Sequence, residues 1–163
     1  MKLQTLGICC ALALPLSAQA QKTETFDVTT YTVPKGWQKK PGASVVQLSV
    51  SGDKGSCVIL IFKSIAGTAD AKANFASSWE SIVVKAVKPS SPPDSQPTFM
   101  QDGWTIESGL ARYEIDGQQG TALLLTGTGG SKVANVLIFT DSAAYQPQIS
   151  AFLKSLSLKK PTT

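Results

Sequence analysis

The stretch "CVILIF", Cys57–Phe62, is apolar at every position. Side chains of a β-strand point alternately to its two faces, so a strand of this composition is covered on both sides. A second run, "VLIF" at Val136–Phe139, has the same property. Together the two runs predict a sheet that lies between two layers of helices.

One segment with helical periodicity, Thr68–Val87, lies between these runs. Apolar residues recur in it at spacings of four, three and four, which is typical of a helix with one buried face. Thr68 or Asp70 is placed to cap its start. The residues expected on the buried face are Phe75, Trp79, Ile82 and Ala86.

A second helical segment follows the "VLIF" run and begins at Asp141 or Ser142. Pro147 fits such a helix only in its first turn, where the missing N–H would have no partner. The residues expected on the buried face are Tyr145, Ile149, Phe152 and Leu156.

The rest of the chain has the β-branched composition and turn dipeptides of strands. Asp102-Gly103 and Asp116-Gly117 are hairpin signals, and neighbours joined by tight turns pair antiparallel. The predicted fold class is α+β: an α/β/α sandwich around a mainly antiparallel sheet of about seven strands, in the order βββ-α-ββββ-α. The expected strands include Phe26–Val33, Ser44–Val50, Ser56–Phe62, Trp104–Glu114, Gln119–Thr126 and Lys132–Thr140, and a Pro/Ser connector without periodicity occupies Lys88–Pro97.

Residues 1–20 have the composition of a secretory signal peptide. Lys2 precedes a short apolar run, and Ala18-Gln19-Ala20 predicts cleavage before Gln21. We therefore expect one domain, residues 21–163, in the periplasm or the extracellular medium. Cys57 is then the only cysteine, so no disulfide forms within the chain. No later stretch is long and apolar enough to be a transmembrane segment.

The segments "YTVPKGW" at Tyr31–Trp37, "FASSW" at Phe75–Trp79 and "YQPQISAFLKSLSLK" at Tyr145–Lys159 resemble the Mog1/PsbP-like fold family. The similarity is greatest to small exported bacterial proteins related to DcrB, whose function is unknown. The resemblance implies an α/β/α sandwich around an antiparallel sheet. It implies no catalytic residues, because members of this family share a scaffold and not a reaction.

Signals for catalysis or metal binding are weak. The chain has no histidine, and its net charge of +4 is too small to indicate nucleic-acid binding. Cys57 opens an apolar strand, which favours a buried, inert thiol. "SGDK" at Ser51–Lys54 and "TGTGGSK" at Thr126–Lys132 are interpreted as turns. We expect no enzyme, no cofactor and no metal.

The candidate ligand-binding residues are aromatic and basic: Trp37, Lys39, Lys40, Trp104 and Arg112. Trp37 and the lysines could bind an anionic glycan or a lipid headgroup through stacking and charge. Alternatively, Trp37 covers a sheet edge while the lysines stay solvated and protect that edge from further pairing. Trp104 leaves the same two interpretations open. Arg112 needs an acidic partner if it points inward.

Three functions remain open from the sequence. The favoured one is a non-catalytic binding or adaptor module of the cell envelope, whose partner is another envelope protein or a glycan. A lipid or small-molecule carrier would need an apolar cavity of roughly several hundred Å³. A hydrolase would need serine or carboxylate groups that meet only in the folded chain.

Overall fold

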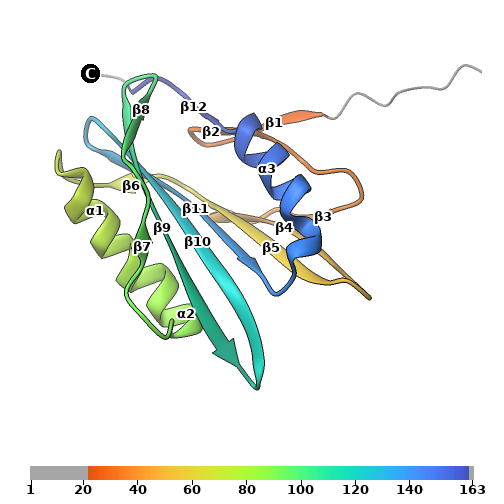
Figure 1. The fold of residues 1–163 in the computed structure, drawn as a ribbon. Helices are drawn as coiled ribbons and strands as arrows, with labels where there is room; N and C mark the ends of the chain where they lie inside the picture. The colour runs from red at the N-terminus through yellow and green to blue at the C-terminus, as the bar shows by residue number, and fades with distance from the viewer. Residues whose placement is uncertain (1–21, 162–163) are drawn as a thin grey trace, which may run out of the picture.

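The computed structural model describes residues 22–161 (Figure 1). The predicted signal peptide, residues 1–20, lies outside the described residues. Within the described part, the chain has the expected α+β architecture, with a mainly antiparallel sheet and helices on its two faces (Figure 1). None of the helices in residues 22–161 is long and apolar enough to cross a membrane.

The central sheet has nine strands, not about seven, and every pairing in it is antiparallel. Seven strands lie in the order β3-β4-β5-β11-β10-β9-β7, while β6 pairs with β11 and β8 pairs with β9. The additional strands are two or three residues long, too short to produce a detectable alternation in the sequence. The bounds are β3 Gln38–Lys40, β4 Val45–Gly52, β5 Gly55–Phe62, β6 Ile65–Ala66, β7 Asp94–Ser95, β8 Phe99–Gln101, β9 Trp104–Ile115, β10 Gln118–Gly129 and β11 Lys132–Thr140.

The prediction of one strand at Phe26–Val33 is wrong. Asp27 has a φ of 54° and turns the chain, so that β1 (Thr23–Phe26) and β2 (Thr29–Thr32) form a hairpin. Aspartate is among the few residues that adopt this left-handed conformation readily. The hairpin joins β12 (Ser157–Leu158) in a separate three-stranded sheet beside α3 (Figure 1).

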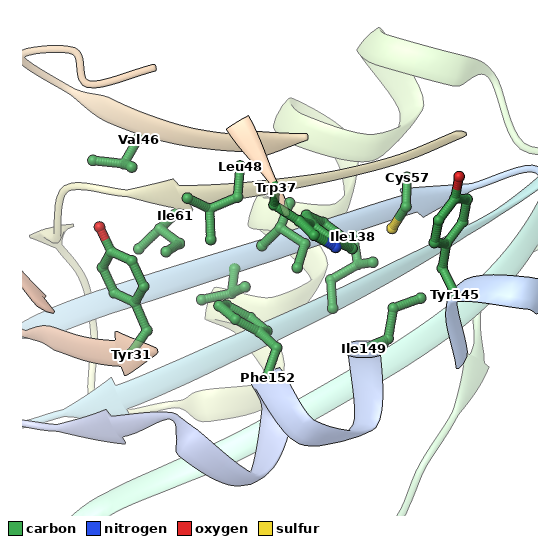
Figure 2. Packing of buried hydrophobic residues seen from close by; sticks show 12 residues of the cluster. Tyr31, Trp37, Val46, Leu48, Cys57, Ile61, Ile138, Tyr145, Ile149 and Phe152 are labelled. Atoms are coloured by element: carbon green, nitrogen blue, oxygen red, sulfur yellow. The ribbon is translucent and has the colours of Figure 1, made fainter. Parts of the chain in front are cut away.

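The "CVILIF" run is covered on both sides, as predicted. Cys57, Ile59 and Ile61 are fully buried on the face that packs against α3 (Gln146–Ser155), and Figure 2 shows Ile149 and Phe152 of that helix pointing at the strands. Leu60 and Phe62 lie on the other face, in the cluster with the first helical segment. Burial raises the pKa of the Cys57 thiol to about 11, which keeps it protonated.

The last helix begins with a short 3-10 turn, η2 (Ala143–Tyr145), which leads into α3. The Ser142 hydroxyl accepts a hydrogen bond from the Ala144 N–H at 3.1 Å and so caps the start. Pro147 lies in the first turn of α3, where its lack of an N–H costs no hydrogen bond. The predicted start is confirmed, and so is the buried face for Tyr145, Ile149 and Phe152. Leu156 lies just beyond the end of the helix in extended backbone and is only partly buried, so its predicted place on the helical face is wrong.

The first helical segment is continuous but not uniform. It consists of α1 (Ala71–Ser78), a π-helical stretch η1 (Trp79–Val84) and α2 (Lys85–Val87). Asp70 caps its start by accepting a hydrogen bond from the Ala73 N–H at 3.0 Å. The predicted buried face is correct for Phe75 and Trp79 but wrong for Ala86, which is exposed, and Ile82 is only partly buried.

Val83 and Val87 are buried in place of Ile82 and Ala86. A π-helix forms hydrogen bonds between residues five apart, so each turn contains more residues than in an α-helix. With these wider turns, every fourth residue returns to the same face. The buried apolar residues Phe75, Trp79, Val83 and Val87 are therefore spaced by four along the whole segment.

Candidate functional site

Trp37 lies inside the protein, on the side of the sheet that α3 covers. Its side chain is 8% exposed and packs edge to face against Tyr145, with 6.2 Å between the ring centres. Figure 2 shows the indole among the aliphatic side chains on the α3 side of the sheet. Lys39 forms an ion pair with Glu24 at 2.5 Å and lowers the pKa of that carboxyl, while Lys40 is exposed. The structure thus separates the indole from the lysines.

Trp104 and Arg112 lie apart from each other, one in the core and the other at the surface. Trp104 is fully buried, and its Nε1–H donates to the Lys159 carbonyl at 2.9 Å. Arg112 is exposed at a polar hollow of about 260 Å³ that Asp141 and Gln146 also line. The five candidate residues from the sequence therefore do not form one site.

The structure instead draws attention to Glu107, which was not among the candidate residues. Glu107 belongs to β9 and shares the helix-facing side of this strand with Gly109 and Ala111. The residue is only 8% exposed, although carboxylates are almost never fully buried unless they are paired. The small size of the neighbours on the same face is the sequence signal that could have indicated space around this carboxylate.

An irregular edge of the sheet lies directly beside Glu107. On the edge of β9, β7 pairs through Ser95 with Gly109, and β8 pairs through Phe99 with Ile106. Between these two pairs, β9 has two residues while the facing segment 96–98 has three. One extra residue on one strand is a β-bulge, a feature that often re-aims side chains next to functional sites.

The bulged segment, residues 96–98, makes one backbone hydrogen bond to β9 and one side-chain hydrogen bond to the Glu107 carboxylate. The Gln96 N–H still donates to the Ser108 carbonyl at 2.9 Å, but Pro97 has no N–H with which to continue the ladder. The Thr98 hydroxyl donates to Glu107 Oε1 at 2.8 Å. The bulge therefore positions Thr98 against the buried carboxylate.

A groove of about 560 Å³ opens between α1 and the bulged segment. Glu107 and Phe75 are its buried members, at 8% and 9% exposure. The volume is within the range of about 300–1,000 Å³ that is typical of small-molecule sites. Its walls contain Lys72, Phe75, Ser95, Gln96, Pro97 and Thr98.

The position of α1 beside the groove is fixed by side-chain hydrogen bonds and close packing. The Asn74 amide donates to the Thr68 carbonyl at 2.8 Å and to Thr128 Oγ1 at 3.0 Å. Phe75 lies directly over Gly109, since a Cβ atom at that glycine would be 2.8 Å from Phe75 Cζ. One wall of the groove is therefore rigidly attached to the sheet.

The polar groups that line the groove are a carboxylate, a lysine ammonium, two hydroxyls and an amide. Glu107 is the only carboxylate among its lining residues, and no hydrogen bond in the described residues joins Ser95 to Lys72 or to Glu107. Nucleophilic catalysis needs a nucleophile and a base within hydrogen-bond reach. Residues 22–161 also contain no group of three or more potential metal ligands. The groove offers one buried charge, an aromatic ring and hydroxyl and amide groups.

A second hollow, lined mainly by apolar residues, lies between the sheet, α3 and β12. It holds only about 70 Å³, and its lining includes Thr29, Phe99 and Leu158. The Thr29 hydroxyl, 1% exposed, has no hydrogen-bond partner among the described residues. The volume is far below the several hundred Å³ that the carrier hypothesis requires.

One of the solved structures that this chain resembles is a protein from Bacteroides thetaiotaomicron VPI-5482. The TM-score is 0.55 at 12% sequence identity, and the match covers 86% of this chain and 49% of that protein. The chain thus spans about half the length of the structure it matches, and a likeness at this identity concerns the fold alone. No protein-family model matches the chain, and a search of characterised proteins finds no match.

Proposed function

We propose that the chain is an exported, non-catalytic binding module of the cell envelope, and that it binds its ligand in the groove over Glu107. The observation that supports the site is a carboxylate, 8% exposed, at the wall of a hollow of about 560 Å³. A buried polar group with unfilled hydrogen-bonding capacity destabilises a fold, so a carboxyl group with one side-chain hydrogen bond at the wall of an accessible groove supports a binding role.

The export part of the proposal rests on residues 1–20, which have the pattern of a secretory signal. We expect the protein in the periplasmic or extracellular fraction, with an N-terminus at Gln21. Peptide mapping of the purified native protein tests this: an N-terminus at Met1 in the cytoplasmic fraction would contradict export.

The same proposal includes a Mog1/PsbP-like classification, closest to the small exported DcrB-like proteins. Support comes from the antiparallel sheet with helices on both faces and from the order of the main elements. A partner protein or glycan of the envelope would then be the source of the group that enters the groove.

A thermal-shift screen tests the binding role. The library contains amines, carboxylates, sugars and lipids, and the variants are Ser95→Trp, which fills the groove, and Ser91→Trp, an exposed position that does not line it. We expect at least one compound class to raise the melting temperature of the wild type and of Ser91→Trp but not of Ser95→Trp. A library in which no compound distinguishes the two variants would refute the groove as the binding site.

A further inference from the structure

Glu107 has no positively charged partner in the described part of the chain. The one ion pair within residues 22–161 joins Lys39 of β3 to Glu24 of β1, and neither strand contains Glu107. Among residues 22–161, the only hydrogen bond to the Glu107 side chain comes from Thr98 and occupies Oε1. A carboxylate accepts about four hydrogen bonds, so most of its capacity is available to a molecule in the groove.

The surroundings of the carboxylate indicate the kind of group that fits. The Phe75 ring presents an apolar surface beside the charge, and such a surface packs well against methylene groups or the face of a cation. Ser95 and Thr98 add hydroxyl oxygens that accept hydrogen bonds. A charged head next to a short aliphatic stem matches this combination.

We propose that the groove binds an alkylammonium group, from a free diamine or from an exposed lysine side chain, with its positive charge on Glu107. This inference rests on the binding function proposed above and names the ligand class for the same groove. The ammonium hydrogens satisfy the available oxygen positions of Glu107, and the methylene stem lies along Phe75.

Other cations fit the groove less well. A guanidinium binds best with two parallel hydrogen bonds to both carboxylate oxygens, and Thr98 already donates to one of them. Calcium requires six to eight oxygen ligands, whereas Glu107 is the only carboxylate that lines the groove. A point charge with three rotatable donors makes no such demand on geometry.

Lys72 makes the sign of the ligand charge testable. It is an exposed residue of α1 on the groove wall, and it forms no ion pair with Glu107. A cationic ligand is repelled by Lys72, whereas an anionic ligand would be attracted by it and repelled by Glu107. Loss of the lysine charge therefore strengthens the binding of a cationic ligand and weakens the binding of an anionic one.

Isothermal titration with 1,5-diaminopentane, Nα-acetyl-lysine methylamide and pentanoate tests the inference on the full chain. Glu107→Gln keeps the shape and the acceptor for Thr98 but removes the charge, and Glu114→Gln is the matched control at an exposed position of the same strand. We expect at least tenfold weaker amine binding in Glu107→Gln, no change in Glu114→Gln, and stronger binding in Lys72→Ala. The diamine and the blocked lysine distinguish a free amine from a protein side chain as the source.

Two results would overturn the ligand class. One is amine binding that Glu107→Gln leaves unchanged, with circular dichroism showing the variant folded. The other is binding of pentanoate, but of neither amine, that Lys72→Ala abolishes. In the second case the groove still binds a ligand, so the proposed function stands while the inference fails. The function itself fails only if filling the groove with Ser95→Trp affects no ligand.

Discussion

The π-helical stretch predicts which side chains of the first helical segment stabilise the core. Val83 is fully buried and Ala86 is exposed, whereas an unbroken α-helical spacing from Trp79 would bury Ile82 and Ala86. Val83→Ala removes two methyl groups, each worth about 0.8 kcal/mol of transfer free energy. The cavity adds on the order of 1 kcal/mol. We expect a total loss of about 2–3 kcal/mol in the free energy of unfolding.

Ala86→Lys is the informative partner variant. Alanine and lysine both favour helices, so at an exposed position we expect a change within about 0.5 kcal/mol. Urea unfolding followed by circular dichroism measures both variants, and a loss of about 2–3 kcal/mol lowers the midpoint by roughly 1 M. A midpoint for Ala86→Lys as low as that of Val83→Ala would refute the π-helical register, because the lysine would then lie against the sheet.

Three further outcomes follow from burial and hydrogen bonding. Trp79→Ala, at a side chain that is 4% exposed, is expected to cost about 3–5 kcal/mol, and an unchanged urea midpoint would contradict its place in the core. Cys57, fully buried and with its pKa raised to about 11, should resist iodoacetamide at pH 8 in the native state and react after unfolding, as peptide mapping would reveal. The Ser56 N–H and hydroxyl hold the pKa of Asp141 below its ordinary value of 3.8, so its stabilising effect is present above that value and is lost as the pH falls through the lowered pKa. Asp141→Asn should therefore show a weaker fall of melting temperature in acid than the wild type, and equal slopes would argue against the hydrogen bonds.

The sequence was sufficient for the layered architecture because that architecture depends on long, regular patterns. A strand apolar at every position and two helical stripes specify buried faces through side-chain direction alone. For the first helical segment, the predicted buried face is correct up to Trp79 and fails after it, where the backbone hydrogen bonding changes to a π-helical pattern. Residue types in "WESIVV" give no sign of a π-helix, since every one of them also occurs in α-helices.

The candidate site was less accessible to sequence analysis. Aromatic and basic residues were selected because they often bind ligands, but Trp37 and Trp104 lie in the core, where their large apolar surfaces stabilise the fold. Glu107 could be placed on a strand, yet its burial depends on a facing segment that has no periodicity of its own. Such a contact between a connector and a sheet edge is a property of the tertiary structure.

The bulge at 96–98 offers a direct test of whether the groove is a built feature. Deletion of Pro97 leaves two residues facing two between the pairs Ser95–Gly109 and Phe99–Ile106, so the edge can form a regular ladder. We expect the variant to fold with a melting temperature at least equal to that of the wild type, because a regular edge satisfies more backbone groups.

The same deletion should abolish ligand binding, since the segment that forms one wall of the groove would then lie along β9. The measurement combines the melting temperature with titration of the ligand found for the wild type. Deletion of Ser91, which lies outside the groove, is the matched control and should leave binding intact. A stable Pro97 deletion that binds as tightly as the wild type would mean that the extra residue has no part in recognition. Stability gained together with binding lost would instead indicate that the chain keeps an irregular edge strand for its ligand and not for its fold.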